Sequence, residues 1–387
     1  MTILNTTRTI YLDNAATTSV SQPVADLVVE CMRREFGNPA SAHHIGVSAE
    51  RRVEHATNVV ADLLGDPKGL HGKILFCSGG TEADAIGVIG AARARPERRA
   101  IMISAIEHPA VVESATELLS EGKETITIPA TPDGSLSVSR VLESMSEDVG
   151  VVSFMLVNNE LGSILPVGEI SEAIRKNFSH EVHIHCDAVQ AFGKVPISVE
   201  KLNVDSLAIS AHKIHGPKGS GALWLKHGAK VKPLWNGGGQ QDGIRSGTLN
   251  VPGIAGLGLA AENMSKEMPE RSQRFEEMKS QLRSAAEASG VSFRENAAKS
   301  PRAPHILSLS FEDIPAQPLL HVLESRGILV SAGSACSERS SKPSRILTAI
   351  GLPENYGTLR ISFGCETTFA EIEKAAETLE AALKSFS

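Results

Sequence analysis

Between about residues 45 and 230, short apolar runs alternate with longer amphipathic stretches. Apolar runs of strand length, separated by helix-length segments, predict a parallel sheet with helices on both faces. Ligands of such sheets bind beyond the carboxyl ends of the strands. Several of the runs end in polar residues, so a functional site is expected there. The candidate strands are residues 74–77, 101–104, 151–157, 182–186 and 206–210.

A second unit is predicted at the end of the chain. At 387 residues the chain exceeds the size at which one core usually divides. A long helical stretch at 251–288 leads into a tail with a strand at 306–311 and helices at 318–325 and 369–386. We predict a large domain of residues 15–264. Residues 1–14 and 265–387 would form a smaller α+β domain, with a mobile loop at 331–343.

Charge and cysteine content exclude several classes of protein. The 38 Lys and Arg residues against 45 Asp and Glu residues give a net charge of −7, without a long block of one sign, which argues against nucleic acid as a ligand. No apolar run reaches the roughly 18 residues of a spanning helix, and residues 1–5 lack signal-peptide features. The five cysteines are scattered, as in a reducing compartment without disulfides. We therefore expect a cytoplasmic protein with no membrane contact.

The most informative single residue is Lys213, which follows the run at 206–210 and precedes a glycine-rich turn at 216–221. A partly desolvated lysine near other cations has a lowered pKa and can attack a carbonyl to form a Schiff base. A solvated loop lysine is the commoner explanation for such a residue on its own. Its neighbours at other strand ends therefore decide the interpretation.

A small-residue turn at 77–83 joins a predicted strand to a predicted helix. It contains Gly80 and Thr81, whose backbone N–H groups and hydroxyl could bind a phosphate. An ordinary helix cap would explain the same residues.

Two other strand ends carry ionisable residues. Asp187 follows the run at 182–186, and Gln190 lies on the same side three residues later if a helix begins there. His108 follows the run at 101–104. A helix-capping aspartate and a structural histidine are the simpler alternatives for each residue alone.

Cys336 differs from the other cysteines because the segment 331–343 is too small and polar to be a core element. Arg339 and Lys342 nearby would favour the thiolate. The other four cysteines lie on a helix or at strand ends, where cysteine usually acts as a buried small hydrophobe. Cys336 is thus the candidate nucleophile.

Taken together, ten ordered segments resemble the cysteine desulfurases of the NifS/IscS type, which are class V aminotransferase-like enzymes of fold type I that depend on pyridoxal phosphate (PLP). The resemblance covers nearly the whole chain. It implies an α/β fold, with a mostly parallel seven-stranded sheet in the large domain and a smaller α+β C-terminal domain. The segments are 11–18, 36–41, 78–82, 107–108, 157–162, 187–190, 210–217, 237–240, 245–248 and 334–336.

The resemblance also implies a cofactor site. Lys213 would bind PLP as a Schiff base, Asp187 would pair with the pyridine nitrogen, and a carboxylate there keeps the ring an electron sink. Gln190 would contact the ring hydroxyl and His108 would stack on the ring. Thr248 would reach the phosphate of the neighbouring subunit, which implies a homodimer. The residues expected to hold the phosphate within one chain are Gly80, Thr81, Ser210 and His212.

The implied reaction converts L-cysteine to L-alanine and leaves the sulfur on Cys336 as a persulfide. Asn159 and Arg360 would bind the substrate carboxylate, for which a guanidinium suits a bidentate grip. The sulfur would pass to an acceptor protein such as an iron–sulfur scaffold, or into another thiolation pathway. No metal site is expected, although Cys336 could transiently ligate an iron–sulfur cluster.

Three alternatives remain. A selenocysteine lyase would share the cofactor site, and a class V aminotransferase would need a keto-acid acceptor and no loop thiol. A non-catalytic scaffold is disfavoured by the intact set of Lys213, Asp187 and His108.

Overall fold

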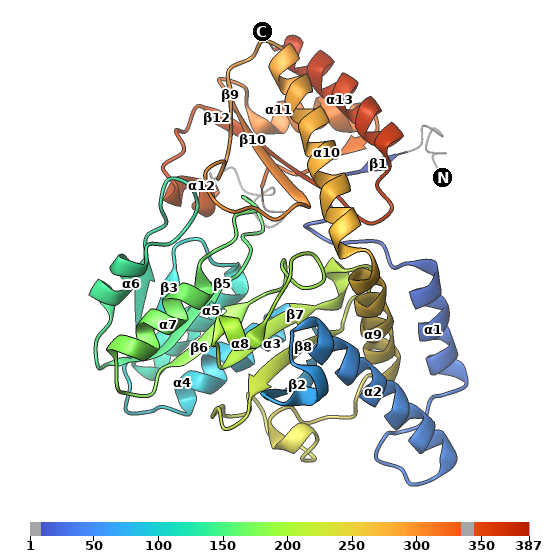
Figure 1. Ribbon diagram of the computed structural model, residues 1–387, viewed down its shortest axis with the longest axis vertical. Coiled ribbons are helices and arrows are strands. Elements are labelled where there is room, and N and C mark those ends of the chain that lie inside the picture. The colour runs from blue at the N-terminus through green and yellow to red at the C-terminus, as the bar shows by residue number, and fades with distance from the viewer. Residues whose placement is uncertain (1–8, 334–343, 387) are drawn as a thin grey trace.

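The computed structural model describes residues 9–333 and 344–386 (Figure 1). Its larger part is built on a seven-stranded sheet with the order β2-β8-β7-β6-β5-β3-β4. β8 runs antiparallel to both of its neighbours and the other pairings are parallel, which confirms the predicted mostly parallel sheet. In that order the strands are Gly72–Cys77, Gly221–Lys226, Ser206–Ser210, His183–Asp187, Val149–Met155, Ala100–Ser104 and Glu124–Ile128.

Apolar side chains cover both faces of this sheet, as expected when every strand reads as an apolar run. Met102 and Val152 belong to the largest core cluster with residues of α7, whereas Ile103 and Val151 pack with residues of α5. The helices of this part are α1 (Gln22–Arg33), α2 (His44–Leu63), α3 (Gly80–Ala85), α4 (Ala91–Arg93), α5 (Pro109–Glu117), α6 (Val138–Ser144), α7 (Val167–Asn177), α8 (Val199–Leu202) and α9 (Val251–Lys266). A π-helical segment, Ile86–Gly90, joins α3 to α4, and 3-10 turns lie at Pro67–Gly69, Leu118–Glu121, Ala211–Lys213 and Gln241–Gly243.

Most predicted strands match within a residue or two, and the predicted helical stretch at 251–288 is helical but interrupted. The chain forms two helices, α9 and α10 (Met268–Ala288), separated at Glu267. Glu267 has a non-helical backbone, with φ −128° and ψ 23°, and Pro269 occupies the first turn of α10. Proline suits a helix start but interrupts a helix interior, so the break falls there.

The C-terminal residues form a separate set of layers, reached through α10 (Figure 1). A three-stranded antiparallel sheet has the order β12-β10-β9, and the short strand β1 pairs with β11. Residues of these strands and helices share a second core cluster that includes Ile10 and Leu12. The elements are β1 (Ile10–Tyr11), β9 (Phe293–Glu295), β10 (Ile306–Glu312), α11 (Ala316–Ser325), β11 (Ile328–Leu329), α12 (Arg345–Ala349), β12 (Tyr356–Ser362) and α13 (Phe369–Lys384).

The exact domain limits, 14/15 and 264/265, stay a prediction. Within the part of the chain that the structure describes, no helix has the length and apolar character needed to span a bilayer.

Candidate active site

A cavity of about 500 Å³ lies beyond the strand ends of the seven-stranded sheet, where residues of the C-terminal layers also reach it. The segment Ala15–Ala16 and the first residues of α12 line it as well. The cavity brings together most of the residues predicted from the sequence, namely Gly80, Thr81, His108, Asn159, Asp187, Gln190, Ser210, His212, Lys213 and Arg360.

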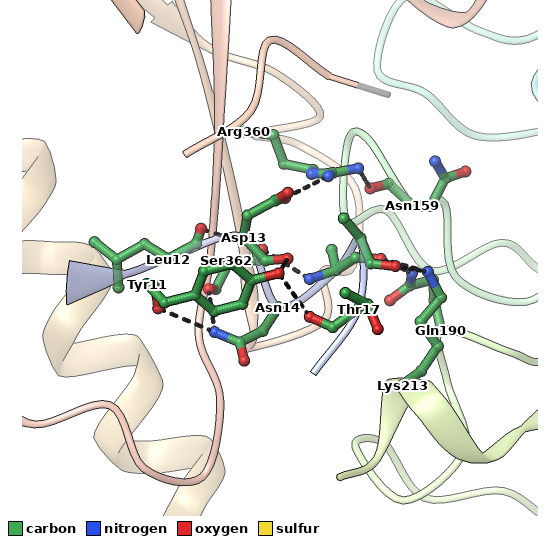
Figure 2. Close-up of polar contacts among 12 residues, drawn as sticks. Tyr11, Leu12, Asp13, Asn14, Thr17, Asn159, Gln190, Lys213, Arg360 and Ser362 are labelled. Atoms are coloured by element: carbon green, nitrogen blue, oxygen red, sulfur yellow. Dashed lines mark hydrogen bonds and ion pairs between the residues drawn. The ribbon is translucent and has the colours of Figure 1, made fainter. Parts of the chain in front are cut away.

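Lys213 enters the cavity from the 3-10 turn that directly follows β7. Its Nζ donates to the carbonyl oxygens of Ala15, at 2.7 Å, and Ala16, at 2.6 Å (Figure 2). Gln190 donates to the same Ala15 oxygen at 2.8 Å. The amine is therefore held by a backbone segment that comes from the start of the chain.

A group of acids and one imidazole forms the next part of the site. One side-chain atom each of Asp84, His108 and Asp187 lies within 4.8 Å of the other two. Asp187 ends β6, and His108 caps α5 by accepting a hydrogen bond from the Ala110 N–H at 3.1 Å. Burial raises the pKa of both carboxyls, and their mutual repulsion raises that of Asp84 further. Burial also lowers the pKa of His108.

The sequence analysis assigned no role to Asp84. Its Oδ1 lies 3.1 Å from Nε2 of His185, and both side chains are buried. His185 Nδ1 in turn lies 2.8 Å from the Ser206 hydroxyl. The available signal was a carboxylate directly before the small and apolar run 85–92, because a carboxylate that is buried with such a run needs a partner.

The phosphate-binding residues predicted around Gly80 converge on one corner of the cavity. A side chain at Gly80 would lie 2.7 Å from Cγ2 of Val189, so only glycine fits this approach. The buried hydroxyl of Ser210 has no hydrogen-bond partner among the described residues. His212 Nδ1 lies 3.1 Å from the Thr17 hydroxyl, and burial lowers its pKa to about 4.

Arg360 and Asn159 meet at the side of the cavity that faces the C-terminal layers. NH1 of Arg360 donates to the Asn159 carbonyl oxygen at 3.0 Å, and NH2 donates to Asp13 at 2.6 Å. Asn158 shapes this turn, because its Oδ1 accepts from the N–H groups of Glu160 and Leu161, each at 2.9 Å.

Family comparison identifies the relationship. The aminotransferase class-V family model matches residues 10–375. A cysteine desulfurase IscS of Methanosarcina thermophila is 36% identical over 375 residues, which is 96% of this chain and 91% of that protein. The chain belongs to the class V aminotransferases, among the cysteine desulfurases of the NifS/IscS type.

Solved structures of this family agree. A NifS-like protein superposes with a TM-score of 0.89 at 34% identity, covering 97% of this chain and 100% of that chain. SspA in complex with cysteine gives a TM-score of 0.80 at 31% identity, covering 93% and 100%. The predicted family and the predicted α/β fold of the PLP-dependent type I are therefore confirmed.

One predicted residue is not brought into the cavity, and another lies outside the described residues. Thr248 is exposed and does not line it. Cys336 lies outside the described residues. The described residues on either side of its segment both reach Glu160, which lines the cavity. A Cβ at Gly333 would lie 2.9 Å from Oε2 of Glu160, and the Ser344 hydroxyl donates to the same oxygen at 2.6 Å.

Proposed function

We propose that the protein removes sulfur from L-cysteine, releases L-alanine and carries the sulfur on Cys336 as a persulfide, with PLP held at Lys213. One observation carries this proposal. A single cavity holds an amine, a buried carboxylate beside an imidazole, and a buried guanidinium, from Lys213, Asp187, His108 and Arg360 respectively. These are the groups needed to bind an aldehyde cofactor and the carboxylate of an amino acid.

The residues fit PLP. The unpaired Ser210 hydroxyl and the glycine-only approach at Gly80 provide a place for a phosphate, with Thr81 and His212 beside it. Lys213 would hold the aldehyde carbon, and His108 would lie against the ring. The crowded carboxyls, Asp187 foremost, would be stabilised by a cationic ring nitrogen. PLP, when bound, supplies an electron sink for bonds to the substrate's α and β carbons.

Gln190 would orient the ring hydroxyl. Its Oε1 accepts from Lys194 Nζ at 3.2 Å and lies 3.3 Å from Nε2 of His305. These contacts point the amide nitrogen of Gln190 away from Lys194 and His305. One of its two N–H groups donates to the Ala15 carbonyl oxygen. The second N–H is thus suited to the ring oxygen.

The chain's own residues would carry the substrate steps. Arg360 and Asn159 would bind the substrate carboxylate, and Lys213 as a free amine would take the Cα proton. The Cys336 thiolate would attack the substrate sulfur. A sulfur–sulfur bond forms, the carbon–sulfur bond breaks, and its electron pair stays with the carbon, which takes a proton to become the methyl group of alanine. Lys213 would then return the proton to Cα.

Chain connectivity supports the role of Cys336. It is three residues from Gly333, and three residues span at most about 10 Å. Gly333 contacts the cavity residue Glu160. This chain length would allow the thiol to reach a substrate in this cavity.

The remaining proposals concern partners. The exposed Thr248 lies on a segment anchored by the ion pair of Arg245 with Glu82, 2.7 Å long, and would contribute to the neighbouring subunit of a homodimer. The sulfur acceptor would be a protein such as an iron–sulfur scaffold, in the cytoplasm.

The test measures alanine and sulfide formed from L-cysteine in the presence of a thiol reductant. We expect equal amounts of both from the wild type and a loss of at least about 100-fold in Lys213→Ala and Cys336→Ala. Cys336→Ala should retain the PLP absorbance band. Cys365→Ala is the matched control, because burial raises the pKa of that thiol and its loss should leave activity within about two-fold.

Full activity in Cys336→Ala with selenocysteine alone would indicate a selenocysteine lyase. Alanine formation that needs a keto acid would indicate an aminotransferase. Absence of a PLP absorbance band in the wild type would reject the proposal that this chain is a PLP-dependent enzyme.

A further inference from the structure

Arg360 is a buried cation whose hydrogen bonds are only partly used. Its side chain is 2% exposed and lines the cavity. One terminal nitrogen donates to the Asn159 carbonyl oxygen and the other to Oδ1 of Asp13 (Figure 2). Nε has no hydrogen-bond partner among the described residues. A guanidinium has five N–H donors in a rigid plane, so two contacts fix its orientation and leave donors for a ligand.

Asp13 is held firmly by the strand that carries Arg360. Asp13 forms a parallel bridge with Ser362, two residues beyond Arg360 on β12. The Ser362 hydroxyl accepts from the Ala15 N–H at 2.9 Å, and Asn14 donates to the Ser362 carbonyl oxygen at 3.0 Å (Figure 2). The Asp13 carboxylate and the Arg360 guanidinium are thus mounted on one rigid support.

The same short segment reaches Lys213. Ala15 and Ala16 follow Asp13 directly, and their carbonyl oxygens accept from Lys213 Nζ. One stretch of backbone therefore positions the amine and, through Asp13, the guanidinium.

We propose that Asp13 is a positioning residue that fixes Arg360 to receive the carboxylate of the amino-acid substrate, and that it thereby sets the preference for ligands with a free carboxylate. This inference rests on the proposed function. An arginine side chain has many rotamers. A guanidinium already held by an ion pair loses less conformational entropy on binding a carboxylate than a free one does.

The opposite role would be competition, in which Asp13 occupies Arg360 at the expense of the substrate. The two roles predict opposite signs. Removing a positioning carboxylate weakens the binding of a carboxylate ligand, whereas removing a competitor strengthens it.

The test compares holoenzyme of the wild type and Asp13→Asn, which keeps the shape of the side chain and removes its charge. Binding of L-alanine and of L-alaninamide, which lacks the carboxylate, is followed by the change in cofactor absorbance. We expect the Kd of L-alanine to rise about ten-fold and that of L-alaninamide to change less than two-fold. With L-cysteine, KM should rise by a similar factor while kcat stays within about three-fold.

Tyr11→Phe is the matched control. The Tyr11 hydroxyl donates to the carbonyl oxygens of Asp13 and Thr17, so its removal loosens the same segment but keeps the carboxylate. Its Kd for L-alanine should stay within two-fold. An unchanged or lower Kd in Asp13→Asn would overturn the proposal, as would equal weakening of alanine and alaninamide. A wild type that binds both ligands normally but forms no alanine from L-cysteine would instead reject the proposed function.

Discussion

Two groups of buried ionisable residues flank Lys213, one made of carboxyls and one of basic side chains. The acidic group consists of Asp84, Glu107 and Asp187, and two of these line the larger cavity. The cationic group consists of Lys194, Arg271 and His305, which line a much smaller cavity of about 10 Å³. Lys213 borders both cavities.

The two groups differ in how their charges are satisfied. Arg271 of the cationic group donates to the carbonyl oxygens of Gly193, at 3.1 Å, and Met264, at 2.6 Å. Burial raises the pKa of Glu107 to about 8, and its Oε2 has no partner among the described residues.

This difference separates a functional from a structural use of buried charge. Carboxyls that are crowded and poorly paired are unfavourable until a cation arrives, and such perturbed groups are typical of binding sites. Cations bonded to carbonyl oxygens tie segments of the chain together. The acidic group should therefore limit stability, and the cationic group should support it.

The largest effect is expected for Asp187→Asn. Alanine formation should fall at least about 100-fold, and PLP should be lost on dialysis, because the partner of the ring nitrogen is removed. The free energy of unfolding of the cofactor-free variant, measured with urea, should nevertheless be about 1 kcal/mol higher than that of the wild type, because a buried charge is gone. The Val189 N–H, which donates to Asp187 Oδ1 at 2.9 Å, keeps an acceptor in asparagine.

Asp66→Asn is the contrasting control. Asp66 is fully buried, but it accepts hydrogen bonds from the N–H groups of His71, Gly72 and the Trp224 indole. The amide of asparagine would face donors, so this variant should lose about 2 kcal/mol. A destabilised Asp187→Asn would show that the two buried aspartates are satisfied alike, and would end the comparison.

Much of the acidic side could be predicted from the sequence, and the reasons are local. Asp187 and His108 each follow an apolar run, and the ends of parallel strands meet at one edge of the sheet. The strands themselves were predicted because buried parallel strands are continuously apolar. The π-helical continuation of α3 and the break before Pro269 leave weaker local signals.

The pairing of Asp13 with Arg360 could not be predicted in the same way. The two residues are 347 positions apart, and nothing near Asp13 in the sequence specifies which cation it meets. The cationic group has the same origin, because Lys194 and Arg271 come together only when the start of α10 packs against the turn at Gly193. Functional residues at strand ends can be predicted from one sequence, whereas contacts between distant segments depend on how the chain packs.

The stability of Glu107→Gln should differ from that of the wild type in its pH dependence. The Glu107 pKa rises from 4.5 to about 8 on folding, so the folded state holds a proton that the unfolded state has lost. Wild-type stability should therefore fall as the pH rises from about 5 to 8, by about 1.4 kcal/mol per unit from this group. Urea unfolding of cofactor-free protein should show the advantage of Glu107→Gln growing over that range. A constant difference would mean that Glu107 is ionised in the fold.

Lys194→Met should show the opposite slope over a narrower range. Burial lowers the pKa of Lys194 from 10.5 to about 7, so between those values the unfolded state binds a proton that the folded state lacks. Wild-type stability should therefore rise with pH there, by about 1.4 kcal/mol per unit relative to Lys194→Met. Only about pH 7 to 9 is practical for urea unfolding, so the measured change is smaller than for Glu107→Gln. The titratable groups that face Lys194 are Lys213, Arg271, His305, His215, His212 and Cys365. Because these remain in the variant, a difference that does not vary with pH would show that the Lys194 amine is charged throughout, and that the cationic group carries its charge at no cost to the fold.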